Sequence, residues 1–176
     1  MPILSREAIL ERLQATPPLL EGLLDPAAQL QPNGVDLTLA SLARMATPGR
    51  LGATDAERLL SKRSLLKFDG AGWAHLAPGP YLCVFNEAVH LPRDLMAFGR
   101  TRSSLLRSGV SLHTAVWDAG YSGRSEALLM VYNPEGVHLA HNARIMQMVF
   151  LSLDRETKRG YAGRFSRENL GRRAPE

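Results

Sequence analysis

Residues 65–99 consist of short apolar runs separated by glycine and proline. This spacing limits the possible folds more than any other feature of the sequence. Each run is four or five residues long, which is the length of a short strand rather than of a helix. Short strands at regular spacing between Pro and Gly turns are typical of all-β sandwiches and barrels. We therefore expect a mainly β fold. The expected strands are Trp73–Leu76, Tyr81–Phe85, Ala88–Leu91 and Leu95–Gly99.

The first 25 residues predict a short helical segment. Ser5 suits an N-cap, and Ile9, Leu10 and Leu13 follow at helical spacing. The pair Pro17-Pro18 ends this helix, because proline lacks a backbone N–H and clashes with the preceding turn.

Further strands are expected on both sides of the central region. A turn at residues 32–34 leads into a strand that reaches Leu39, in which apolar residues alternate with Asp36 and Thr38. This alternation predicts that Asp36 faces away from the apolar side. Two strands joined by a turn at residues 133–136 are expected later in the chain, Ser125–Tyr132 and Ala143–Leu153.

Residues 40–67 carry no recognisable chemistry. Thr54 and Glu57 stand at the spacing of a capping box before Leu59 and Leu60, which predicts a short capped helix. We interpret the segment as an insertion or a lid-like loop on a compact core.

Composition limits the classes of function. A chain of 176 residues with one cysteine suits a single domain and has neither an intrachain disulfide nor a multi-cysteine zinc site. Cys83 has apolar neighbours, so we expect a buried thiol. No apolar run approaches the roughly 20 residues of a membrane span, and no signal pattern opens the chain, so we expect a cytoplasmic protein without a membrane partner. The net charge of +4 suits an anionic partner, and arginines spread through the chain favour a nucleotide over nucleic acid.

One stretch, Gly99–Gly123, gathers groups that suit a phosphorylated substrate. Arg102 and Arg107 flank the hydroxyls of Ser103 and Ser104, and these donors fit phosphate oxygens. Asp118 follows at the expected tip of a hairpin, just before a Gly-Tyr pair. The alternative is a capped helix start with solvated arginines and a surface turn, although a capped helix start is itself an anion site.

Five segments resemble, in order, the motifs of the dUTPase and dCTP deaminase superfamily. Together they extend over most of the chain, from about residue 30 to residue 165. The segments are PNGVDLTLA (32–40), RSSLLRSG (102–109), HTAVWDAGYSG (113–123), ARIMQMVF (143–150) and YAGRF (161–165).

The resemblance implies a role for individual residues. Asp118 corresponds to the carboxylate that deprotonates the attacking water, and Tyr121 to the ring that packs on deoxyribose. The alternative for Tyr121 is a half-buried hairpin aromatic. Asp36 corresponds to a residue linked to a neighbouring subunit's site, with a turn-stabilising or salt-bridging Asp as the alternative. The implied substrate-binding residues are Arg102, Ser103, Ser104, Arg107, Tyr121, Gln147, Tyr161, Arg164 and Phe165. For Gln147 the alternative is a polar residue on the outer face of its strand.

The superfamily includes two reactions, hydrolysis of dUTP and deamination of dCTP. Zinc-dependent deamination needs several cysteines, which this chain lacks. Metal-free dCTP deaminases resembling this chain use a Glu about ten residues beyond the Asp, where Leu128 stands; counting back from Asn133 reaches Met130. Glu126 is the only acid on this strand, and a bulge would be needed to slide it toward the site. Hydrolysis is therefore favoured.

We expect one domain over residues 1–176 with a dUTPase-like fold, a β-clip or jelly-roll-type barrel with a short N-terminal helix. Residues 1–25 form the helical segment and residues 157–176 a mobile closing tail. The expected activity is hydrolysis of dUTP to dUMP and pyrophosphate in nucleotide metabolism, by a homotrimer with sites between subunits. Mg²⁺ would be held through the substrate phosphates and not by direct protein ligands. A dCTP deaminase, a bifunctional enzyme and a non-catalytic nucleotide- or nucleic-acid-binding module are the alternatives.

Overall fold

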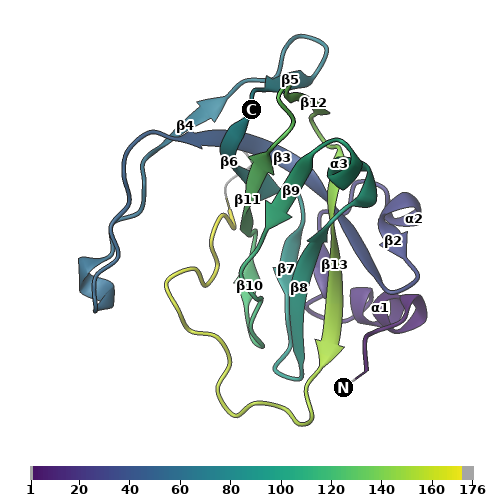
Figure 1. Ribbon diagram of the computed structural model, residues 1–176. Helices are drawn as coiled ribbons and strands as arrows, with labels where there is room; N and C mark the ends of the chain where they lie inside the picture. Colours follow the sequence, from purple (N-terminus) through teal and green to yellow (C-terminus); the bar gives the residue numbers. More distant parts are fainter. Residues whose placement is uncertain (1, 172–176) are drawn as a thin grey trace.

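An antiparallel sheet of eight strands, curled until its two edges almost meet, forms the body of the protein (Figure 1). The computed structural model describes residues 2–171. At the seam, Thr101 Oγ1 accepts a hydrogen bond from the Leu112 amide (2.7 Å) and donates to the Leu112 carbonyl (3.3 Å). The expected mainly β fold is confirmed. The strand order is β8 (Leu95–Thr101), β13 (Arg144–Ser152), β3 (Gly34–Met45), β6 (Gly79–Phe85), β11 (Glu126–Val131) and β9 (Val110–His113), with β2 (Leu30–Gln31) and β4 (Arg63–Leu66) both paired to β3.

Two smaller sheets lie at opposite ends of this body (Figure 1). One consists of β1 (Leu20–Glu21), β7 (Ala88–His90) and β10 (Ser122–Gly123), and the other is a ribbon of β5 (Trp73–Leu76) and β12 (Val137–Ala140). The ribbon corrects the sequence interpretation, because the turn at residues 133–136 leads into β12 and not directly into the last long strand. Strand β12 was missed because Gly136 precedes this short run but no glycine or proline follows it before Ala143.

The core follows the alternation of the strands. In β6, Tyr81, Cys83 and Phe85 are buried, and Ala127 and Leu129 of β11 lie opposite Cys83 and Tyr81 in register. Burial raises the pKa of the Cys83 thiol to about 12, as expected for a structural cysteine rather than a nucleophile.

Strand β3 departs from the expected pattern, because both of its faces are covered. Asp36 and Thr38 alternate with apolar residues as expected, yet each is only 2% exposed. The second face is closed by Glu87, which accepts hydrogen bonds from the Thr38 amide and hydroxyl (2.9 and 2.6 Å) and from Gln29 (2.7 Å). Residues distant in sequence therefore bury a face that the strand pattern predicts to be open.

The N-terminal helix is confirmed. α1 (Arg6–Leu13) begins after Ser5, whose hydroxyl accepts a hydrogen bond from the Ala8 amide (3.3 Å). The remainder of residues 2–25 is not helical. A second helix, α2 (Pro26–Gln29), begins after Asp25, and its signal was an Asp N-cap followed by Pro at the first helical position.

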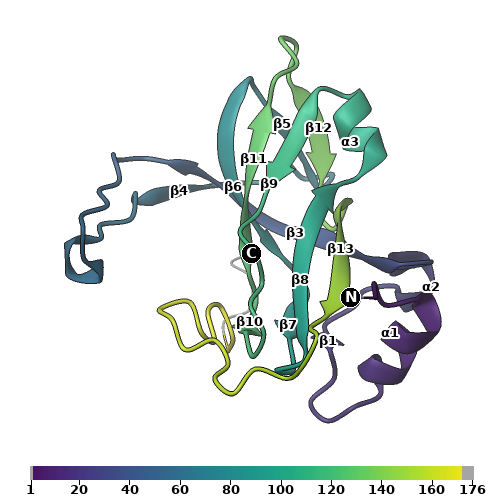
Figure 2. The same ribbon diagram turned by 60° about the horizontal axis from the view of Figure 1, so that its bottom comes forward.

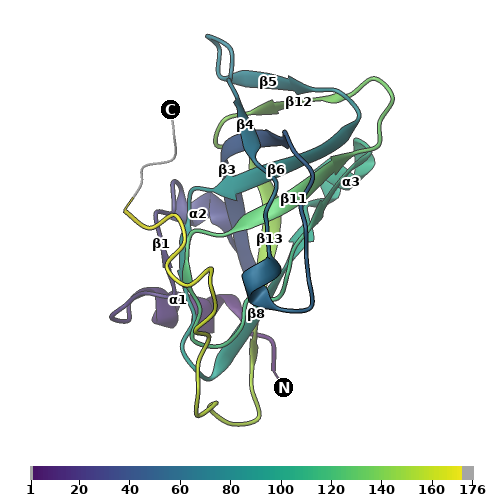
Figure 3. The same cartoon turned by 90° about the vertical axis from the view of Figure 1, so that its left-hand side faces the viewer.

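Residues 46–62, hereafter the arm, project from the barrel between β3 and β4 (Figures 1 and 3). The expected capped helix is a single 3₁₀ turn, η1 (Asp55–Glu57), in which the Glu57 carboxylate accepts a hydrogen bond from the Thr54 amide (3.1 Å). Leu51 and Leu59 are 78% and 59% exposed, so the arm is not packed on the body. Within residues 2–171, no helix has the length and apolar character needed to cross a membrane.

Candidate active site

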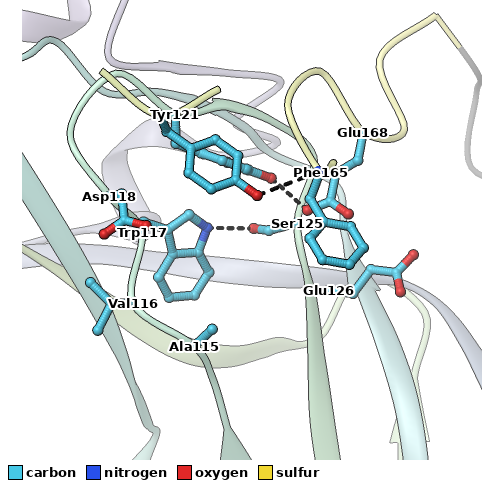
Figure 4. Close-up of a pocket in the computed structure, with 10 residues that line it drawn as sticks. Ala115, Val116, Trp117, Asp118, Tyr121, Ser125, Glu126, Phe165 and Glu168 are labelled. Atoms are coloured by element: carbon cyan, nitrogen blue, oxygen red, sulfur yellow. Dashed lines mark hydrogen bonds between the residues drawn. The ribbon is translucent and has the colours of Figure 1, made fainter. Parts of the chain in front are cut away.

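A pocket of about 200 Å³ lies between the loop at residues 114–121, the start of β11 and the C-terminal segment at residues 157–171, hereafter the tail (Figure 4). It brings together five residues selected from the sequence: Asp118, Tyr121 and Glu126 of the barrel, and Tyr161 and Phe165 of the tail. The other lining residues are Ala115, Val116, Trp117, Ser125 and Glu168.

Asp118 is held by its neighbour Trp117. The Trp117 backbone exchanges two hydrogen bonds with Ala97 (2.9 and 3.0 Å), and its buried indole Nε1 donates to Ser125 Oγ (2.8 Å). Anchoring of this kind fixes the backbone from which the exposed Asp118 carboxylate reaches the pocket. The loop is not the hairpin expected from the sequence, because β9 pairs with β11 whereas β10 pairs with β7.

Gly120 allows this loop to meet the tail. Its φ is +85°, and a Cβ at this position would lie 2.7 Å from Gly160 Cα. The Tyr161 amide donates to the Ala119 carbonyl (2.8 Å) at the same place. A side chain at Gly120 would therefore strain the turn and push the tail away.

Tyr121 is more buried than the half-buried hairpin aromatic of the alternative interpretation, at 5% exposed. Its hydroxyl donates to Glu168 Oε1 (2.7 Å), and its ring meets Tyr161 edge-on at 5.7 Å. Burial, reinforced by the Glu168 carboxylate, raises the pKa of Tyr121. The ring is thus a fixed, neutral wall of the pocket.

Glu168 was not selected from the sequence, because a single acid in a polar, arginine-rich end has the pattern of a solvated residue. In the structure it faces Tyr121 across the pocket (Figure 4). Burial raises the pKa of Glu168, the hydrogen bond from Tyr121 lowers it, and the negative charge of Glu126 raises it further.

Glu126 is turned away from Asp118 (Figure 4). Its Oε1 forms an ion pair with Arg63 Nη1 (2.6 Å) and accepts a hydrogen bond from Asn169 Nδ2 (3.1 Å). Strand β11 pairs with β6 in continuous register from Glu126 opposite Val84 to Val131 opposite Gly79. The bulge that would slide Glu126 toward the site is therefore not present on this strand.

The tail folds back on its own chain. The Arg167 amide donates to the Ser122 carbonyl (2.6 Å), and the Arg124 amide donates to the Glu168 carbonyl (2.9 Å). Phe165 reaches the pocket, while the exposed Arg164 lines an adjacent groove of about 840 Å³. Residues 172–176 of the expected closing tail lie outside the described residues.

The expected phosphate donors lie elsewhere. Ser103, Ser104 and Arg107 belong to α3 (Ser103–Arg107), with exposed side chains, at the end of the barrel opposite β10 (Figures 1 and 2). The N-cap of α3 is Arg102, not either serine. Among the described residues, those that line the pocket include none from α3.

Arg102 forms an ion pair with Asp36. Its Nε lies 3.0 Å from Asp36 Oδ2, and Arg144 Nη1 lies 3.4 Å from the same oxygen. Burial raises the pKa of Asp36, and the two guanidinium groups oppose that effect. The salt-bridging interpretation of Asp36 therefore describes its contacts within this chain. Gln147 lies opposite Asp36 on β13, against Gly34, where a Cβ would be 3.1 Å from Gln147 Nε2.

The donor set suits Mg²⁺ held by a substrate better than Mg²⁺ held by protein ligands. Among residues 2–171, no group of three or more His, Cys, Asp or Glu side chains could hold a metal ion. Magnesium is commonly bound through one or two carboxylates and substrate phosphates.

Comparison with known proteins places the chain in a family. A model of dCTP deaminase-like proteins matches residues 3–153. The chain is 44% identical over 170 residues to a probable deoxyuridine 5′-triphosphate nucleotidohydrolase of Methanococcoides burtonii, covering 97% of this chain and 100% of that one. A protein of the same description from Methanosarcina mazei is 45% identical over 169 residues, covering 96% of this chain and 99% of that one.

A solved structure is also similar to this chain. The crystal structure of 2′-deoxycytidine 5′-triphosphate deaminase from Agrobacterium tumefaciens superposes with a TM-score of 0.64 at 25% identity. The match covers 84% of this chain and 48% of the deaminase, so this chain spans about half the length of that protein. The matched model and the end-to-end relatives confirm the resemblance carried by the five motifs: the chain belongs to the dCTP deaminase-like family.

Proposed function

We propose that this protein is a dUTP diphosphatase, which hydrolyses dUTP to dUMP and pyrophosphate. One observation carries the proposal: Asp118 is presented at a pocket by the anchored Trp117, beside the fixed ring of Tyr121. The relatives from Methanococcoides and Methanosarcina, both described as probable dUTP nucleotidohydrolases, support the same activity.

We propose an in-line attack by water. The Asp118 carboxylate accepts a proton from a water molecule as the water oxygen forms a bond to the α-phosphorus. The bond from that phosphorus to the bridging oxygen breaks, and pyrophosphate leaves with the electron pair. We propose that Tyr121, held in place by burial and by its hydrogen bond to Glu168, packs on the deoxyribose and selects it by excluding a 2′-hydroxyl.

A complete site requires a second chain. Within one chain, α3 with its donors Ser103, Ser104 and Arg107 lies at the end of the barrel opposite β10 (Figure 2), and none of the described residues that line the Asp118 pocket belongs to α3. We propose a homotrimer in which α3 of one subunit supplies phosphate donors to the pocket of the next, with Gln147, Arg164 and the tail completing the enclosure. Mg²⁺ would be carried by the triphosphate. We place the enzyme in the cytoplasm, in pyrimidine deoxynucleotide metabolism, without a nucleic-acid partner.

Deamination of dCTP is the less favoured alternative. Its proton shuttle would have to be Glu126, whose carboxylate is ion-paired with Arg63 and turned away from Asp118. The position ten residues beyond Asp118 is Leu128, whose side chain has no ionisable group and cannot transfer a proton.

Incubation with dUTP and with dCTP separately, in the presence of Mg²⁺, tests the proposal. Pyrophosphate from dUTP and no ammonia from dCTP are expected. Ammonia release from dCTP would favour the deaminase or the bifunctional enzyme. Absence of both products, together with salt-dependent binding to random DNA, would favour a non-catalytic module.

A further inference from the structure

The ion pair between Arg63 and Glu126 lies where the arm, the barrel and the tail meet. Arg63 is the first residue of β4 and therefore the root of the arm, and Glu126 is the first residue of β11. One oxygen of Glu126 accepts hydrogen bonds from both Arg63 Nη1 (2.6 Å) and Asn169 Nδ2 of the tail (3.1 Å). A single carboxylate thus connects two segments that are more than 100 residues apart.

The tail is attached to the barrel at this same place by further hydrogen bonds. Asn169 Nδ2 also donates to the Arg124 carbonyl (2.9 Å), and Arg124 Nη1 donates to the Asn169 carbonyl (2.9 Å). Residues 168–169 therefore bind directly beside Glu126. Tyr161 and Phe165, which line the pocket, lie just upstream of this attachment.

Closing the tail brings two carboxylates together. Glu168 and Glu126 line the same pocket and the same adjacent groove. Burial raises the pKa of Glu168 and the charge of Glu126 raises it further, while the positive charge of Arg63 lowers it. Arg63 compensates both acids, and its side chain is only 39% exposed. Without this guanidinium, the closed tail would hold two like charges in a partly buried place, which is unfavourable.

Arg63 lies outside the pocket itself. It lines the adjacent groove, which shares Ala115, Glu126, Phe165 and Glu168 with the pocket. A residue at this place acts on the reacting groups through the tail and not by contact.

We infer that Arg63 is a positioning residue for the reaction, which keeps the tail closed over the Asp118 pocket by compensating Glu126 and Glu168. This inference rests on the proposed function for its effect on turnover, but the closure of the tail is measurable without any substrate.

The first experiment measures amide hydrogen exchange in the full-length protein without nucleotide. Arg63→Gln should speed exchange of the Arg167 and Arg124 amides, which form the bonds between tail and barrel, by about fivefold, the upper range for a partly exposed ion pair. Arg58→Gln is the matched control, because Arg58 pairs with Asp55 within the arm and its loss removes the same charge. Arg63→Lys keeps a positive charge and should restore part of the protection.

The second experiment measures pyrophosphate release from dUTP by the same variants. In Arg63→Gln, kcat/KM should fall about fivefold, mostly through KM, because bound phosphates help to close the tail once substrate is present. Arg63→Lys should fall less, and Arg58→Gln should match the unmutated protein.

Unchanged exchange in Arg63→Gln, or an equal effect of Arg58→Gln, would overturn the inference. Faster exchange with unchanged kcat/KM would also overturn it, since the tail would then be attached without positioning anything. If the unmutated protein releases no pyrophosphate, the proposed function fails, whereas the exchange experiment still decides whether Arg63 holds the tail.

Discussion

The backbone of Gly99 lies directly against the buried side chain of Met146. The two residues lie on the neighbouring strands β8 and β13, and a Cβ at Gly99 would be 2.1 Å from Met146 Sδ and 3.0 Å from its Cγ. Met146 is fully buried. The glycine on the facing strand makes room for the methionine.

Gly99→Ala should therefore destabilise the protein by about 1–3 kcal/mol, the usual cost of overpacking a core. Met146→Ala should also destabilise it, by about 2–5 kcal/mol, because it leaves a cavity. The double variant should be more stable than the sum of the two single effects implies. Urea unfolding of all four proteins gives the coupling free energy, and simple additivity would show that the two sites are independent.

Asp118→Asn should keep substrate binding but lower kcat by about 10²–10⁴-fold, because the amide cannot accept the proton of the attacking water. Binding of a non-hydrolysable dUTP analogue, measured by calorimetry, and single-turnover pyrophosphate release separate the two effects. Equal losses in affinity and rate would mean that Asp118 only holds the substrate.

Some of this site could be predicted from the sequence, and the rest depends on contacts that sequence patterns do not record. Asp118 and Tyr121 lie within one short motif, so their proximity follows from local chain geometry. Glu168 and Arg63 reach the same place from segments more than 100 residues apart, and neither belongs to a periodic pattern. Their contribution is visible only after the tail and the arm are positioned by tertiary packing.

The fold, like the site, could be predicted from the sequence only in part. Strand β5 has the predicted bounds, Trp73–Leu76, because glycine and proline delimit the run on both sides. The burial of Asp36 could not be predicted, because the cover over its strand comes from distant residues that include Arg102 and Arg144. A strand pattern records which residues alternate, but not what packs on the second face.

Removing residues from Gly160 onward should leave the barrel folded, because Tyr161 is the one tail residue packed on the core cluster of residues 2–171. Turnover should fall sharply, since the closing segment excludes water and completes the pocket. The truncation also removes Glu168, so the pKa of Tyr121 should move back toward its ordinary value. Thermal melting, pyrophosphate release and ultraviolet titration of tyrosine check the three effects. Full activity of the truncated protein would exclude a closing role.

The buried Glu87 should make stability depend on pH. Burial raises its pKa above the ordinary value of 4.5, and hydrogen bonds from Thr38 and Gln29 oppose this shift only in part. Because the folded-state pKa is the higher one, the contribution of Glu87 is fully present below its unfolded-state pKa. That contribution is lost as the pH rises through the folded-state pKa. The difference in unfolding free energy between the unmutated protein and Glu87→Gln should therefore decrease as the pH rises above about 4.5. A difference that increases with pH would mean that the hydrogen bonds from Thr38 and Gln29 stabilise the charged carboxylate by more than burial destabilises it.

Glu126→Gln separates the two chemistries of the family. For a dUTP hydrolase, the substitution weakens only the attachment of Arg63 and Asn169, so pyrophosphate release from dUTP should stay within about tenfold, roughly 1.4 kcal/mol of barrier. For a dCTP deaminase, it would remove the only acid on β11 and with it nearly all ammonia release, since general acid–base catalysis contributes about 10²–10⁴-fold. We expect pyrophosphate from dUTP in both proteins and ammonia from dCTP in neither. Ammonia that is released by the unmutated protein and lost in Glu126→Gln would show that Glu126 turns toward the substrate and that the enzyme is a deaminase.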